Sequence, residues 1–153
     1  VAKEWLTKGA KLCGMDTLDV VKGEQFFGKS RFDFYIKDIN GREGYLEVKG
    51  VTLEKDGVVS FPDAPTERGV KHINELVSCK KAGYEAYVIF VIQTDEAIYF
   101  SPNAEPHKEF AQVLKKAISE GVKVLCLTCN VSKNEIIAKG SLFINFTFIF
   151  FIL

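Results

Sequence analysis

The stretch from residue 30 to residue 50 carries charged residues whose types and spacing can do chemistry. It reads SRFDFYIKDINGREGYLEVKG, with Asp33 in one β-like run and Glu47-x-Lys49 in the next. Two carboxylates can hold Mg²⁺ together with waters and phosphate oxygens. A lysine beside them can orient an attacking water or offset charge that develops on a phosphate. The alternative is the polar face of an ordinary hairpin, and the choice depends on whether the three side chains meet.

The turn between the two runs allows two registers. If residues 40–41 form a two-residue type I′ loop, Asp33 lies opposite Val48, and Glu47 points to the other side of the sheet. If residues 39–41 form a three-residue loop with its glycine in the left-handed region, Asp33 lies opposite Glu47.

The residue before the loop favours the three-residue register, because Asp38 suits the first position of a type I turn. That register brings Arg31, Asp33, Glu47 and Lys49 onto one face. Carboxylates directly opposite each other destabilise a sheet, unless a divalent cation lies between them. This register would allow a Mg²⁺ or Mn²⁺ site at Asp33 and Glu47, with Lys49 as the third catalytic residue, but on spacing alone the solvated face of an ordinary hairpin stays open as the alternative.

The rest of the chain predicts the framework that must hold this hairpin. Alternating or continuous apolar runs predict strands over residues 30–38, 43–54, 57–61, 84–93, 122–131 and 135–140. Apolar stripes at helical spacing predict helices over residues 2–9, 65–83 and 106–121. A strand meander followed by alternating helices and strands predicts an α/β domain with a mixed central sheet flanked by helices.

The overall charge limits how the chain can meet a polyanion. Its 153 residues suit a single domain, and 20 Lys and Arg balance 20 Asp and Glu, so the formal net charge is zero. This excludes a histone-like polycation, and nucleic-acid binding would need a local basic patch.

The two ends of the chain bear on its location. The start, VAKEWLTKGAK, lacks the pattern of a secretory signal. We therefore expect a cytoplasmic protein whose cysteines are free thiols. Residues 141–153, SLFINFTFIFFIL, are fewer than the roughly 20 apolar residues of a membrane helix. We expect them to form an atypical hydrophobic tail, and we expect no membrane partner.

Several longer strings follow one another in a distinctive order. They are ExxFGKSRFDF from Glu24, LEVKGVTL from Leu46, FPDAPTERGVKH from Phe61, FVIQTD from Phe90 and FSPN from Phe100. Together they resemble the sugar fermentation stimulation protein A family over roughly residues 1–139. The resemblance implies a restriction-endonuclease-like fold similar to the PD-(D/E)xK nuclease superfamily.

The same resemblance implies site residues and partners. Asp33, Glu47 and Lys49 stand at the motif positions, Glu24 matches an upstream acidic position that would supply a further metal ligand, and DNA is the implied partner. The implied domain covers residues 1–140. We expect the tail after it to have no family counterpart, and we expect the OB-like barrel that precedes this domain in family members to be absent from this chain. The family name implies a regulatory role in sugar metabolism.

The helix after Pro65 offers a candidate phosphate contact. Arg68 and His72 lie one turn apart on its surface, with Lys71 beside them, and together with Arg31 they are the expected nucleic-acid-binding residues. The alternative is a solvated helix face with a Glu75–His72 pair. Three functions therefore stay open: a DNA-binding protein without turnover, a Mg²⁺-dependent nuclease, and a domain that acts only with a partner domain.

Overall fold

The computed structural model describes the backbone of residues 1–53, 58–61, 67–92, 99–102, 108–131, 136–144 and 151–152. Its helices are α1 (Ala2–Thr7), α2 (Glu67–Lys81) and α3 (Lys108–Ser119). Its strands are β1 (Leu18–Phe27), β2 (Ser30–Asp38), β3 (Glu43–Leu53), β4 (Val58–Phe61), β5 (Glu85–Ile92), β6 (Tyr99–Pro102), β7 (Lys123–Val131), β8 (Ile136–Ile144) and β9 (Phe151–Ile152).

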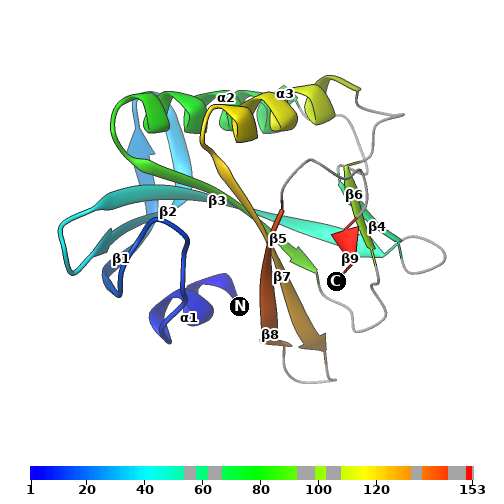
Figure 1. Ribbon diagram of the computed structural model, residues 1–153, viewed down its shortest axis with the longest axis horizontal. Helices are drawn as coiled ribbons and strands as arrows, with labels where there is room; N and C mark the ends of the chain where they lie inside the picture. The colour runs from blue at the N-terminus through cyan, green and yellow to red at the C-terminus, as the bar shows by residue number, and fades with distance from the viewer. Residues whose placement is uncertain are drawn as a thin grey trace.

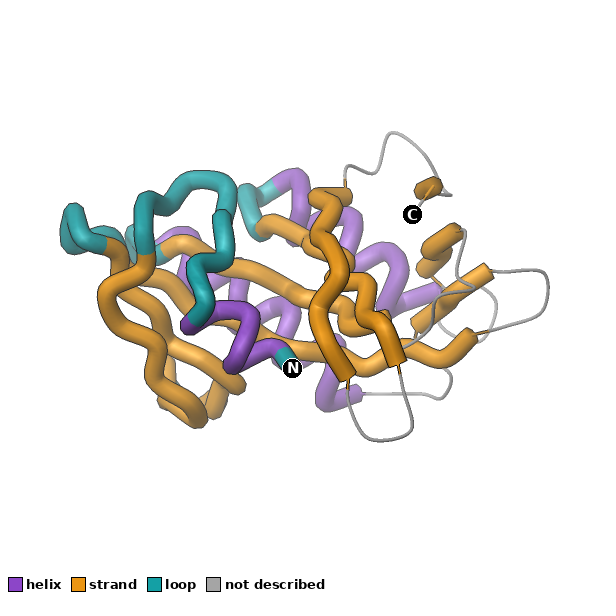
Figure 2. The backbone as a smooth tube through the Cα atoms, turned by 90° about the horizontal axis from the view of Figure 1, so that it is seen from below, coloured by secondary structure: helices purple, strands orange, loops and turns teal. Residues whose placement is uncertain are grey.

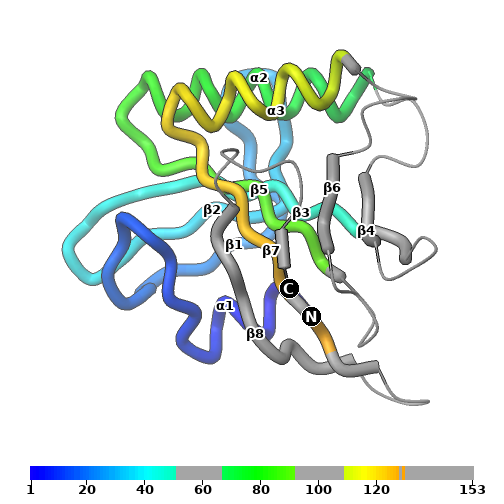
Figure 3. Tube along the Cα trace, turned by 45° about the vertical axis from the view of Figure 1, so that its right-hand side comes forward, coloured from blue at the N-terminus to red at the C-terminus, as the bar shows by residue number. Residues whose placement is uncertain are grey.

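The strands form one mixed sheet in the order β8-β7-β5-β3-β4-β6-β9, and the β1–β2 hairpin joins it beside β3 (Figure 1). Strands β3, β5 and β7 run parallel to one another, whereas β2 and β8 pair antiparallel with their neighbours. Helices α2 and α3 lie side by side over one face, and α1 lies on the other (Figures 2 and 3). The predicted α/β class, with a mixed central sheet flanked by helices, is confirmed.

Strand β5 is buried on both faces, as its near-continuous apolar sequence predicts. Ala86, Val88 and Phe90 pack with α2 and α3, while Tyr87 and Ile89 pack with the residues around α1. This rigid centre holds β3 in place, because β3 pairs with β5 in parallel over residues 44–51.

The hairpin between β2 and β3 has the three-residue loop. Phe34 lies opposite Leu46, the Asp38 amide donates to the Arg42 carbonyl at 2.9 Å, and Gly41 has a φ of +84°. This register, extended by one step, sets Asp33 opposite Glu47. The three-residue prediction is confirmed, and the two-residue alternative is wrong.

Several parts of the sheet differ from the sequence expectations. Strands β1 and β6 were not predicted, and β8 continues through Ile144 into the segment that the sequence analysis counted as a tail. Residues 145–150 and 153 of that segment lie outside the described residues. All four cysteines are free thiols. In the part of the chain described here, no helix is long and apolar enough to cross a membrane.

Candidate functional site

The site lies where β2 separates from β3. Phe32 packs with α2, whereas Phe34 packs with the cluster around α1. Residues two apart in a regular strand share a face, so the backbone of β2 turns over at Asp33. There the Asp33 carboxylate replaces a strand partner, because its Oδ2 accepts a hydrogen bond from the Val48 amide at 2.7 Å. The turn in β2 thus fixes Asp33 in the opening beside β3.

Glu47 has two carboxylate oxygens in different surroundings. Its side chain is buried, and Oε1 accepts from Lys49 Nζ at 2.8 Å and from His72 Nδ1 at 2.6 Å. Its Oε2 is buried and meets no hydrogen-bond donor within the described structure. A buried acceptor without a partner is costly, so this oxygen needs an explanation.

The pKa of Asp33 responds to the charge of the nearby Glu47 carboxylate. Burial raises the pKa of Asp33, the negative charge of Glu47 raises it further, and the Val48 amide, Lys49 and His72 act in the opposite direction. The geometry therefore concentrates negative charge in a partly desolvated site, which a cation would stabilise.

The donor set fits a hard divalent cation. Mg²⁺ is usually bound by one or two carboxylates with waters and phosphate oxygens completing its shell, and Asp33 with Oε2 of Glu47 offers that combination. Within the described ranges, no three side chains of the Asp, Glu, His or Cys type converge closely enough to form a complete protein site. The remaining ligands would come from water or substrate.

Within the described structure, Glu24 does not form a group of three metal-binding side chains with Asp33 and Glu47. The pairs Gly23–Phe34 and Gln25–Phe32 place it opposite Asp33, but it is exposed, with a φ of +52°. Its role as a further metal ligand stays a prediction.

The expected phosphate-binding residues divide into two groups. Arg31, Arg68 and Lys71 are exposed, whereas His72 is buried and turned toward Glu47. The roles of the exposed cations stay predictions. His72 has a carboxylate for a partner here, and its ring edge also meets Phe32 at 5.9 Å between centroids.

The burial of His72 had a signal in the sequence. Gly69, His72, Ile73 and Leu76 follow the i, i+3, i+4, i+7 spacing of one helix face, and all are buried. Sequence reasoning grouped His72 with exposed Arg68 one turn earlier instead, and so missed its contact with Glu47.

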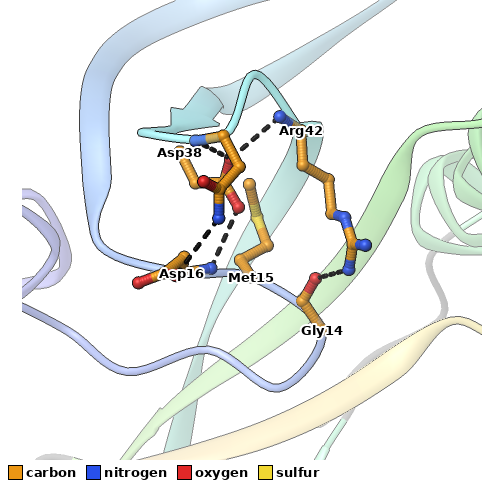
Figure 4. A pocket seen from close by; sticks show the side chains of 6 residues that line it. Gly14, Met15, Asp16, Asp38 and Arg42 are labelled. Atoms are coloured by element: carbon orange, nitrogen blue, oxygen red, sulfur yellow. Dashed lines mark hydrogen bonds between the residues drawn. The ribbon is translucent and has the colours of Figure 1, made fainter.

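A separate pocket of about 350 Å³ lies at the turn end of the same hairpin (Figure 4). The Asp38 carboxylate there accepts from the amides of Asp16 at 2.9 Å, Asn40 at 2.9 Å and Arg42 at 2.8 Å. The Arg42 guanidinium in turn donates to the Gly14 carbonyl. These groups hydrogen-bond to one another, so they attach residues 14–16 to the turn of the hairpin. The pocket is remote from Asp33.

Comparison with known proteins places most of the chain in a family. Residues 1–135 match the family described as "Sugar fermentation stimulation protein RE domain". Sugar fermentation stimulation protein homologs from Clostridium beijerinckii and Desulfitobacterium hafniense are 49% and 50% identical to the chain over 136 residues. Those stretches cover 89% of this chain but 58% of each relative, so the chain spans little more than half their length.

A solved structure supports the same assignment. The structure of Pyrococcus furiosus SfsA in complex with Ca²⁺ superimposes with a TM-score of 0.74 at 30% sequence identity. The match covers 82% of this chain and 54% of the other. The chain therefore belongs to the sugar fermentation stimulation protein family.

Proposed function

We propose that this domain is a DNA-binding module that holds a divalent cation at Asp33 and Glu47, where the cation meets a DNA phosphate. The observation that carries the proposal is the buried Oε2 of Glu47, which has no donor within the described structure and belongs to a carboxylate whose negative charge raises the pKa of Asp33. The Pyrococcus relative was solved with Ca²⁺, which prefers the same oxygen ligands as Mg²⁺.

The side chains around the site have distinct tasks under this proposal. Asp33 and Glu47 would hold Mg²⁺ or Mn²⁺, which when bound neutralises charge on the phosphate. His72 and Lys49 hold Glu47 by its other oxygen. Lys49 is also the cation nearest to the two carboxylates, so its ammonium can donate to a phosphate oxygen that enters the site.

Calorimetric titration of Mn²⁺ into the full chain tests the cation site directly. We expect binding to the wild type, loss of binding in Asp33→Ala, and unchanged binding in Asp19→Ala, which removes an exposed aspartate of β1. Binding that persists in Asp33→Ala would contradict the proposal. A DNA titration in the presence and absence of EDTA then measures whether the cation contributes to DNA affinity.

Phosphodiester hydrolysis is the second candidate function, favoured by the position of Lys49 Nζ 2.8 Å from Glu47 Oε1. A lysine there can orient or deprotonate a water for attack on the phosphate. If the domain is a nuclease, nicking of plasmid DNA with Mg²⁺ should disappear in Glu47→Gln and in Lys49→Ala. If DNA complexes form equally well in EDTA and no nicking follows long incubation, the domain binds without turnover, as a regulator of sugar metabolism would.

A further inference from the structure

The β1–β2 hairpin exposes a large aromatic side chain near the candidate site. Phe26 is 64% exposed, and among the described side chains the other exposed large hydrophobic residues are Ile39 at 60% and Val1 at 36%. Phe26 lies opposite Arg31 in the ladder between β1 and β2. Cross-strand partners point to the same side of a sheet, so the phenyl ring and the guanidinium share one surface.

The hairpin that presents Phe26 is firmly anchored. The next residue, Phe27, points inward and makes edge contacts with Tyr45 at 5.5 Å and with Tyr84 at 5.7 Å between ring centroids. On the other strand, Phe32 is fully buried against α2. Because Phe27 and Phe32 are packed in the core, they fix the backbone of both strands beside Phe26. The exposure of Phe26 therefore does not come from a loose loop.

Two exposed cations, Lys29 and Arg31, lie close to Phe26 along the hairpin, and the exposed Glu24 lies two residues before it on β1. We call the exposed residues Phe26, Lys29 and Arg31 the outer face of the hairpin. Positive charges beside a solvent-facing aromatic ring suit a single nucleic-acid strand, in which phosphates meet the cations and an unpaired base stacks on the ring. A paired base inside a duplex offers no free face, so the aromatic ring favours unpaired bases.

The outer face lies near the candidate cation site along the chain. Arg31 precedes Asp33 by two residues on β2, which corresponds to about 6.6 Å along a strand. The outer face is thus close to Asp33 along β2, but it points away from α2, on which Phe32 packs, whereas Glu47 bonds to His72 of α2.

We propose that the outer face of the β1–β2 hairpin binds nucleic acid with unpaired bases, with Phe26 stacked on a base and Lys29 and Arg31 on the flanking phosphates. This inference rests on the proposed function, because it names the form of nucleic acid that the same domain receives. The inference assigns base stacking to Phe26, a contact that the charged residues of the outer face cannot supply.

Fluorescence anisotropy in EDTA tests the stacking contact without the cation. The ligands are a labelled single-stranded oligonucleotide and the same strand in a blunt duplex. We expect Phe26→Ala to weaken single-strand binding about tenfold and duplex binding less than about twofold. Phe26→Trp should restore single-strand affinity, and a 2-aminopurine base in the strand should be quenched by the wild type but not by Phe26→Ala.

Ile39→Ala is the matched control, because Ile39 is 60% exposed but lies in the loop at the far end of β2. Its single-strand affinity should equal that of the wild type. If Phe26→Ala binds single strands as well as the wild type does, the inference is wrong and the proposed function stands. If the wild type binds Mn²⁺ but neither form of DNA, both the inference and the proposed DNA binding fail. A wild-type dimer that Phe26→Ala dissociates would assign the outer face to a second copy of the chain and overturn the inference.

Discussion

At the scale of single residues, the chemistry of the site depends on how Glu47 is held. Lys49 and His72 both donate to Oε1, so the carboxylate is held in one orientation, and its Oε2 stays buried without a donor within the described structure. Groups that orient a metal ligand from behind commonly affect metal affinity as strongly as the ligand itself. Under the proposed function, His72 is therefore a positioning residue.

Substituting His72 tests this positioning role. His72→Phe keeps an aromatic ring but removes the donor, and we expect Mn²⁺ affinity to fall about tenfold in calorimetry. His72→Asn places an amide nitrogen where Nδ1 was, and we expect it to retain most of the affinity. Equal loss in both variants, with native thermal stability, would show that the ring itself is what matters and would contradict the positioning role.

Asp33 gives a prediction about pH. Because burial raises its pKa in the folded protein, the folded chain binds this proton more tightly than the unfolded chain does. The contribution of Asp33 to stability is therefore largest below its ordinary pKa and declines as pH rises through the raised value. Asp33→Asn cannot ionise and can still accept from the Val48 amide.

We expect Asp33→Asn to match the wild type at pH 3 and to be more stable by about 0.5–1 kcal/mol at pH 7 in the absence of metal. Urea unfolding at a series of pH values measures this difference. Saturating Mn²⁺ should stabilise the wild type and leave Asp33→Asn unchanged. A difference that stays constant with pH would mean that Asp33 ionisation is not the cause.

At the scale of elements, the site depends on the close approach of β3 and β5. A Cβ added at Gly44 would lie 3.0 Å from the Glu85 carbonyl oxygen, whereas one added at Gly50 would meet nothing within 4 Å. Both glycines belong to β3, one on each side of Glu47. We expect Gly44→Ala to lower the free energy of unfolding by about 1–3 kcal/mol through overpacking.

Gly50→Ala is the matched control for this prediction, because it makes the same change in the same strand without a clash. It should leave the free energy of unfolding within about 0.5 kcal/mol of the wild type. Urea denaturation of both variants measures the difference. Equal effects would mean that strand propensity, and not the contact with β5, explains the loss in Gly44→Ala.

The same elements show which features the sequence could predict. Asp38 and Gly41 determine the turn locally, so the register that brings Asp33 to Glu47 followed from turn chemistry. Strand β1 was missed because its alternation is broken, with three consecutive exposed residues at 22–24. The His72–Glu47 contact joins residues 25 positions apart, and only the packing of α2 on the sheet brings them together. Local patterns thus predicted most of the elements but not the contacts between them.

At the scale of the whole molecule, charge limits how the proposed DNA ligand can be bound. The formal net charge is zero, so the protein has no overall field to attract a polyanion, and the proposed DNA affinity must come from a few local cations. Arg31 on β2 and Lys71 on α2 are exposed cations close to residues of the site, since Arg31 precedes Asp33 by two residues and Lys71 adjoins His72. If both contact phosphates, the logarithm of the DNA association constant should fall linearly with the logarithm of salt concentration.

Neutralising one such cation should change the slope of this line and not only lower the DNA association constant at a given salt concentration. We expect Arg31→Gln and Lys71→Gln each to reduce the slope by about 0.7–0.9, the contribution of one phosphate contact to a single strand or a duplex. Lys3→Gln is the control, because Lys3 is exposed on α1 at the other face of the sheet. Anisotropy titrations between low and moderate salt measure the slopes. A slope reduced equally by all three variants would mean that DNA affinity depends only on the total charge of the protein. DNA would then not lie in the region around Asp33 and Glu47.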